Sequence, residues 1–159
     1  MRPEPPAFAG AAAHLRSLES LYAAAPINGI FRSSIEIPEQ GLARIRFEVE
    51  KAMFHAAAAA HGTLYFKMMD DAAFYACNSM VSDRFLLTTA FNLNFTRPLK
   101  AGTVTAEGRW VSGKRRVFVG EARLIDADGE EAARGTGTFM RSHIPLTGLP
   151  GYSAGYTAG

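Results

Sequence analysis

The chain has 159 residues, of which 48% are hydrophobic and 20% are charged, and its formal net charge is +2. This length and composition are ordinary for one globular domain with its own core, and so small a charge gives no support for nucleic-acid binding. The single cysteine, Cys77, excludes an internal disulfide. Because no signal-peptide pattern and no long uncharged apolar run is present, we expect a cytoplasmic protein without a membrane span.

The amino-terminal part of the chain is expected to hold a leader, a short helix and two strands. Residues 1–10 are rich in proline and alanine, and residues 11–25 place leucines at helical spacing. Strands are predicted at residues 30–37 and 43–50, the second of which alternates apolar and charged side chains. The segment 61–81 then predicts a long helix that is apolar on nearly every face, which is typical of a buried helix.

The second half of the sequence has the pattern of a β-sheet. Further strands are predicted at residues 85–96, 103–112, 116–126 and 131–141. Their short turns contain glycine and favour antiparallel neighbours. The expected fold class is therefore α+β, with an antiparallel sheet wrapped around one long central helix and a short N-terminal helix. The main domain would span residues 27–142, after a leader and helix at 1–26 and before a flexible tail at 143–159.

Two adjacent acids, Asp70 and Asp71, interrupt the apolar surface of the predicted central helix. An ionised carboxylate that is buried without a partner is costly, and Lys67 has the helical spacing to neutralise only one of them. The other carboxylate is then a candidate functional group. The alternative is that both acids lie at a solvent-facing edge, paired with Lys67 or with a distant arginine.

His61 and Gly62 stand where this helix is expected to begin. The free N–H groups and the dipole of a helix N-terminus could polarise an acyl carbonyl, and glycine would let a substrate approach the backbone. His61 is expected to cap or shape the turn rather than to catalyse. Taken alone, Gly62 could equally be an ordinary turn glycine.

The run from His61 to Asp70, HGTLYFKMMD, resembles the HGG-x6-D segment of the PaaI-like acyl-CoA thioesterases, the phenylacetate-pathway family of the hot-dog fold. Residues 95–102 and 128–139 resemble the strand-Pro-x2-Gly turn and the last strand of that family. The resemblance covers about residues 35–140 and implies hydrolysis of an acyl-CoA or aryl-CoA thioester. It further implies a homodimer or homotetramer, with no cofactor other than the coenzyme A of the substrate.

The same resemblance implies roles for individual residues. Gly62 matches the residue whose backbone N–H polarises the thioester carbonyl, and Asp70 matches the catalytic carboxylate. His55 lies where relatives carry a polar residue that contacts the thioester. Thr88 lies where some relatives carry a hydroxyl that orients the hydrolytic water.

The sequence departs from the family pattern at two positions. Thr63 replaces the commoner second glycine, and Phe74 fills a position where some relatives place a hydroxyl, which leaves more of that role to Thr88. The basic turn at residues 114–116 could meet the phosphates of coenzyme A or could be a solvated turn. The candidate substrate-binding residues are His61, Thr63, Phe74, Lys114, Arg115 and Arg116.

Gly62 and Asp70 are too far apart to serve one carbonyl within one helix. Eight residues span about 12 Å of straight helix, whereas a reacting carboxylate and carbonyl must come within about 3 Å. Two antiparallel helices around a two-fold axis would bring Gly62 of one subunit to Asp70 of the other. Asp70 would then act as a general base on water or as a nucleophile.

Three other readings compete with a thioesterase. A hydratase or dehydratase would use a His with Asp or Glu in motifs that are absent here. A non-catalytic protein that binds acyl-CoA or a small lipid would gain nothing from a carboxylate in an apolar helix. A purely structural dimerisation module would leave the spacing of Gly62 and Asp70 unexplained. No His, Cys and Asp cluster has the spacing of a metal site.

Overall fold

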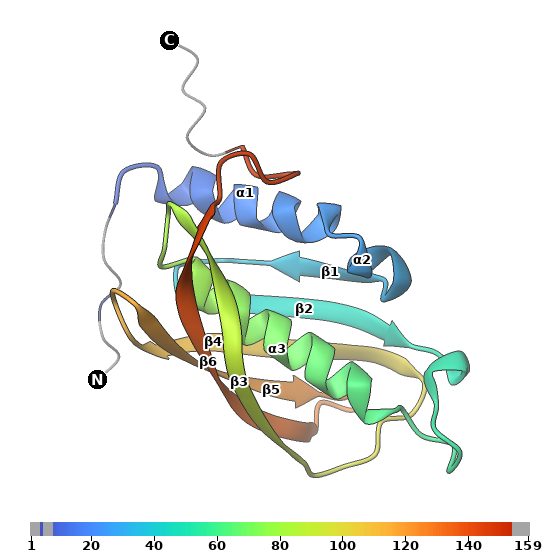
Figure 1. The fold of residues 1–159 in the computed structure, drawn as a ribbon. Coiled ribbons are helices and arrows are strands. Elements are labelled where there is room, and N and C mark those ends of the chain that lie inside the picture. Colours follow the sequence, from blue (N-terminus) through green and yellow to red (C-terminus); the bar gives the residue numbers. More distant parts are fainter. Residues whose placement is uncertain (1–3, 5–7, 154–159) are drawn as a thin grey trace.

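The computed structural model describes Glu4 and residues 8–153. The described part forms a six-stranded antiparallel sheet, in the order β1-β2-β4-β5-β6-β3, that curls around the long helix α3 (Figure 1). This arrangement confirms the predicted α+β hot-dog architecture. The helices are α1 (Ala11–Ala24), α2 (Ile27–Ile30) and α3 (Gly62–Asn78), with a short 3-10 turn, η1 (Lys51–Met53). The strands are β1 (Ser33–Glu36), β2 (Leu42–Val49), β3 (Arg84–Phe95), β4 (Gly102–Ser112), β5 (Val117–Ile125) and β6 (Glu131–Pro145).

Helix α3 is buried because small residues on the helix face glycines on the sheet. A Cβ atom on Gly108 of β4 would lie 2.0 Å from the backbone oxygen of Ala72, and one on Gly120 of β5 would lie 2.8 Å from the sulfur of Cys77. Both positions therefore require glycine if the helix is to lie this close to the strands. Cys77 is fully buried in the core, and this burial raises the pKa of its thiol, as expected for a structural cysteine.

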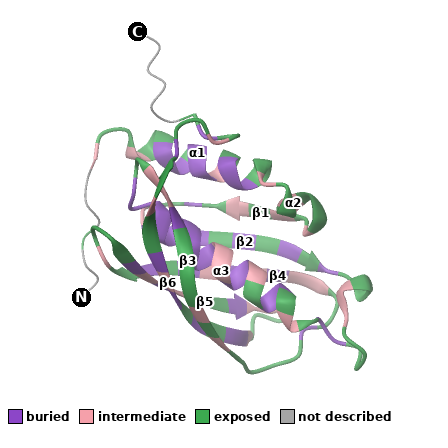
Figure 2. Cartoon of the chain, viewed as in Figure 1, coloured by how far each residue is buried: buried purple, intermediate pink, exposed green. Residues whose placement is uncertain are grey.

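Helix α1 packs along the β1 edge and contributes Leu18 and Tyr22 to the same core that surrounds α3 (Figure 2). It is followed by the short helix α2, where the sequence analysis expected a strand to begin at Ile30. The backbone N–H of Phe31 donates to the carbonyl of Ile27, which closes that turn at 3.0 Å. The observed strand β1 is accordingly shorter than predicted.

The chain after His143 differs from the expected flexible tail as far as Ser153. Strand β6 continues to Pro145, Leu146 is fully buried, and Tyr152 packs against α1. The hydroxyl of Tyr152 lies 2.8 Å from Nδ1 of His14, whose Nε2 donates to the carbonyl of Asn78 at 3.0 Å. The terminal residues 154–159 and most of the predicted leader, residues 1–3 and 5–7, lie outside the described residues.

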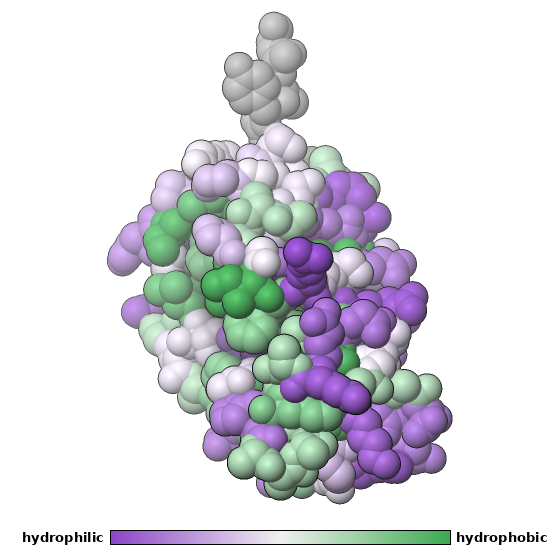
Figure 3. Space-filling view, turned by 90° about the vertical axis from the view of Figure 1, so that its right-hand side faces the viewer, coloured by the Kyte–Doolittle hydropathy of each residue, from purple (hydrophilic) through white to green (hydrophobic). Residues whose placement is uncertain are grey.

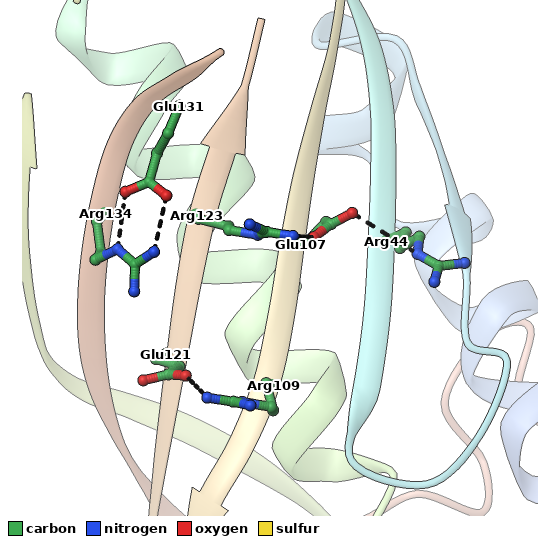
Figure 4. Close-up of polar contacts among 7 residues, drawn as sticks. All are labelled: Arg44, Glu107, Arg109, Glu121, Arg123, Glu131 and Arg134. Carbon is green, nitrogen blue, oxygen red and sulfur yellow. Dashed lines mark hydrogen bonds and ion pairs between the residues drawn. The ribbon is translucent and has the colours of Figure 1, made fainter. Parts of the chain in front are cut away.

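The outer face of the sheet, opposite α3, carries charged side chains that pair with one another, three pairs across neighbouring strands and one within β6 (Figure 4). Their spacing follows the alternation of buried and exposed residues along each strand, which is clearest in β2. The pairs are Arg44 with Glu107, Glu107 with Arg123, Arg109 with Glu121, and Glu131 with Arg134. No helix in the described part of the chain is both long and apolar enough to span a bilayer.

Candidate active site

Asp70 lies in the middle of α3 and faces the start of β3. The hydroxyl of Thr88 donates a hydrogen bond to Oδ1 of Asp70 at 3.0 Å. The register of β3 against β6 shifts between Thr88 and Ala90, an irregularity of the kind that redirects side chains beside functional sites. Among the described residues, no cation forms an ion pair with Asp70. The two predicted site residues Asp70 and Thr88 therefore meet in one chain.

The neighbouring acid, Asp71, forms an ion pair with Lys67. Nζ of Lys67 lies 2.6 Å from Oδ2 of Asp71, and it also donates to the side-chain carbonyl of Asn28 in α2. Both partners are shielded, with 14% of the Lys67 side chain and 24% of the Asp71 side chain exposed. The alternative of two solvent-facing acids is therefore wrong. Asp70 is the carboxylate left without a cation.

The surroundings of Asp70 oppose its ionisation. Burial raises its pKa to about 6, although the Thr88 hydrogen bond lowers it; the charge of Asp71 raises it and that of Lys67 lowers it. A carboxyl group with this pKa is mostly ionised at neutral pH, yet it is more basic than an ordinary aspartate. It can therefore accept a proton from water or attack a carbonyl.

A cavity of about 260 Å³ opens beside Asp70 between α3, β3 and the α1–α2 segment. Its wall is mainly aromatic and aliphatic, and Phe74, a predicted substrate-binding residue, is one of the aromatic residues that line it. The face of the molecule on which α2 lies carries hydrophobic surface between hydrophilic patches (Figure 3). The lining residues used below are Tyr22, Asn28, Asp70, Phe74, Tyr75 and Thr88.

Gly62 is the first residue of α3, and its predicted neighbours shape the helix start. Nδ1 of His61 accepts from the backbone N–H of Thr63 at 3.1 Å and lies 3.0 Å from the Thr63 hydroxyl. His61 is thus the N-cap of the helix, as predicted. The N–H of Gly62 has no acceptor among the described residues, so it is available to a ligand oxygen.

Gly62 lines a second cavity, of about 390 Å³, together with His55. Tyr65 fixes the far wall, because its hydroxyl donates to the carbonyl of Arg97 at 2.6 Å and accepts from the N–H of Leu99 at 2.8 Å. His55 itself is exposed, and its Nδ1 accepts from the N–H of Ala57 at 3.0 Å. The structure therefore brings His55 and Gly62 together, as the sequence suggested.

The two cavities share no lining residue, so one chain holds the predicted site in two halves. One half contains Asp70, Thr88 and Phe74, and the other contains Gly62 and His55. The basic turn lies apart from both, with Lys114, Arg115 and Arg116 exposed between β4 and β5. None of these three cations forms an ion pair within the described part of the chain.

The α1–α2 segment also lines the Asp70 cavity, which the sequence did not indicate. Tyr22 and Asn28 line the Asp70 cavity although they precede it in the chain by more than forty residues. Tyr75 was also missed, because its place in an all-apolar helix gave it the pattern of a core residue. Helical spacing from Asp71, one turn earlier, was the one signal that could have pointed to it.

Known proteins resemble this chain in sequence and in fold. A sequence profile described as the thioesterase superfamily matches residues 58–133. A protein of Saccharolobus solfataricus, provisionally named an esterase, is 26% identical over 64% of this chain and 68% of its own length. A protein of Sulfurisphaera tokodaii with the same provisional name is 28% identical over 64% of this chain and 75% of its own.

Solved structures of other proteins have a similar fold. The PaaI protein of the E. coli phenylacetic acid degradation operon superposes with a TM-score of 0.78 at 21% identity, covering 85% of this chain and 97% of that protein. A mutant thioesterase from Pseudomonas aeruginosa gives 0.71 at 22% identity, covering 80% and 94%. The segment 58–133 is thus similar to the thioesterase superfamily, and the chain has the hot-dog fold seen in PaaI.

Proposed function

We propose that this protein hydrolyses acyl-CoA or aryl-CoA thioesters in an active site shared by two subunits. Asp70 of one subunit acts on the thioester carbonyl that the Gly62 N–H of the other subunit polarises. One observation carries the proposal: Gly62 and Asp70 line separate cavities of a single chain, and each presents an unused reactive group. Neither half is a complete hydrolase by itself.

An exposed sheet edge supports the pairing of two copies. β3 has 12 residues and pairs only with β6 among the described strands, so its other edge has unsatisfied backbone groups. Large apolar side chains lie exposed on it or beside it: Leu87 is 47%, Phe95 57% and Phe66 44% exposed. A second copy that pairs along β3 around a two-fold axis would cover them and set the two α3 helices antiparallel. A pairing of such dimers into a tetramer is compatible with this site.

The chemistry follows from the two halves. The thioester oxygen docks on the Gly62 N–H at the positive end of α3, next to His55. Asp70 either removes a proton from a water that Thr88 helps to hold, or attacks the carbonyl carbon and forms an anhydride that water then cleaves. In both routes the carbon–sulfur bond breaks, the thiolate of coenzyme A leaves and takes up a proton, and the free acid remains.

The coenzyme A end of the substrate needs cations for its phosphates. Lys114, Arg115 and Arg116 are exposed and unpaired within the described residues, which suits this task. By contrast, Arg97 pairs with Asp126 and Glu130, and Arg141 pairs with Asp83. The basic turn is therefore the better candidate for the phosphate contact.

A complementation experiment tests the shared site. Gly62→Pro removes one N–H at the first helical position, where proline is well tolerated, and His61 already has the extended backbone, φ −64° and ψ 143°, that a following proline requires. This variant and Asp70→Asn should each be nearly inactive on an acyl-CoA panel followed by thiol release. Co-refolded in equal amounts, they should recover about a quarter of the wild-type rate, because half of randomly mixed dimers have one intact site of two.

The alternative is a protein that binds acyl-CoA or a small lipid without cleaving it. The raised pKa of Asp70 argues against that role, since a binder has no use for a poorly solvated acid beside its ligand. A mixture no more active than its parents would exclude the shared site. Wild-type protein that releases no thiol from any thioester, while binding one, would establish the alternative.

A further inference from the structure

The Tyr75 hydroxyl is a polar group of the Asp70 cavity that the proposed chemistry does not use. Tyr75 follows Asp71 by one helical turn, and only 6% of its surface is exposed. Its ring packs edge-on against Tyr22 and Phe74, with centroids 5.3 and 5.1 Å away, so the side chain is held in place. Because the ring is held in place, its hydroxyl group also has a fixed position.

The other polar groups around this cavity have partners in the protein. The Tyr22 hydroxyl lies within hydrogen-bond distance of Ser33, Asp71 is paired with Lys67, and the Asn28 amide donates to the carbonyl of Tyr22. The Tyr75 hydroxyl makes no hydrogen bond to any described residue. Every fully buried side-chain oxygen or nitrogen in the described part has a partner. The Tyr75 hydroxyl is therefore open to solvent in the cavity that the residue lines.

An acyl group that fills this cavity expels the water that hydrates Tyr75. Burial, with the charge of Asp71 adding to it, raises the pKa of Tyr75, so the hydroxyl remains a hydrogen-bond donor at neutral pH. A purely apolar acyl chain would leave that donor buried and unsatisfied, which is costly. An acyl group with a well-placed oxygen would replace the lost hydrogen bond.

We infer that Tyr75 is a specificity-determining residue that selects acyl groups bearing a hydroxyl or oxo oxygen beyond the thioester carbonyl. This inference rests on the proposed function and adds to it a substrate class.

The test compares hexanoyl-CoA with hydroxyhexanoyl-CoA thioesters that carry the oxygen at each carbon from the third to the sixth. In wild type, at least one oxygenated substrate should exceed hexanoyl-CoA in kcat/KM by about tenfold. Tyr75→Phe should abolish this preference and retain or increase the rate on hexanoyl-CoA. Tyr22→Phe is the matched control, because its hydroxyl already has a partner, and it should keep the preference.

The outcomes separate the two proposals. No preference in wild type, or a preference that survives Tyr75→Phe, overturns the role of Tyr75 and leaves the Asp70-dependent hydrolysis standing. Loss of the preference in Tyr22→Phe as well would overturn it too, since a general disturbance of the wall would then explain both variants. Absence of hydrolysis on every thioester would overturn the proposed function and this inference together. Melting temperatures within a few degrees of wild type guard against misfolded variants.

Discussion

The acids of the outer face of the sheet and Asp70 in the middle of α3 differ in their partners. On the outer face, Glu107 lies between Arg44 and Arg123, Glu121 pairs with Arg109, and Glu131 pairs with Arg134 (Figure 4). In α3, burial raises the pKa of Asp70, yet its hydrogen bond comes from the Thr88 hydroxyl rather than from a cation. The charge of Asp70 is thus poorly solvated and is not offset by an ion pair among the described residues.

This contrast separates charges that maintain the fold from a charge that costs stability. Exposed ion pairs contribute little, so the outer face is organised mainly for solubility and strand register. An acid left in a poorly solvated cavity destabilises the fold, and proteins accept such a cost chiefly at functional sites.

Asp70→Asn should have the largest effect on activity. The amide keeps the shape and the Thr88 contact but can neither accept a proton nor attack a carbonyl, so kcat should fall by about a thousandfold. Thiol release from an acyl-CoA substrate measures this, with Glu107→Gln as the control for loss of an acid elsewhere. If both variants retained the wild-type rate, Asp70 would be as dispensable as a surface charge.

Gly62→Pro should lower kcat by about a hundredfold, the usual cost of one oxyanion donor. The matched control is Gly62→Ala, which keeps the N–H. Its Cβ would lie 3.2 Å from the end of the Phe95 ring, and a small movement of that exposed side chain can relieve the contact. We expect the alanine variant to lose much less activity. Equal losses in the two variants would indicate crowding at Phe95 rather than a missing donor.

Lys67→Met should destabilise the fold by about 2–3 kcal/mol, because it leaves the Asp71 carboxylate buried without its cation. Urea unfolding at pH 7 measures the change. In the double variant Lys67→Met with Asp71→Asn, most of the loss should be recovered, since no unpaired charge remains. A double variant as unstable as the single one would mean that Lys67 acts through packing on Tyr22 and Asn28 instead.

The pH profile should report the ionisation of Asp70. The active form is the carboxylate, so kcat/KM should fall about tenfold per unit as the pH drops below about 6, the value to which burial raises the pKa of Asp70. Thr88→Val removes a hydrogen bond that lowers this pKa, so the midpoint should move to higher pH. A midpoint near 4 in wild type would contradict the poor solvation of Asp70.

The sequence alone predicted the sheet and the central helix, since alternation along strands and the apolar helix are local patterns. It also left one of the two acids unpaired, but it could not say which, because Lys67 has helical spacing to both. The packing of α1 and α2 over the cavity decides this, since Asn28 holds Lys67 on the Asp71 side. Contacts between residues so distant in the chain leave no periodic signal, and the buried tail near Tyr152 escaped prediction for the same reason.

Glu107→Gln should have the smallest effect, although it breaks two ion pairs at once. Two-thirds of the Glu107 side chain is buried by its neighbours, but both arginines are about half exposed and can return to water. The free energy of unfolding should therefore change by about 0.5 kcal/mol or less, and the change should shrink further in 0.5 M salt.

Asp70→Asn, by contrast, should stabilise the protein at pH 7. The folded state has the higher pKa at this acid, so it loses stability as the pH rises from about 4 to about 6, and the amide removes that loss. If the free energy of unfolding falls in Glu107→Gln and rises in Asp70→Asn, then the acid on the outer face stabilises the fold while the acid in α3 destabilises it.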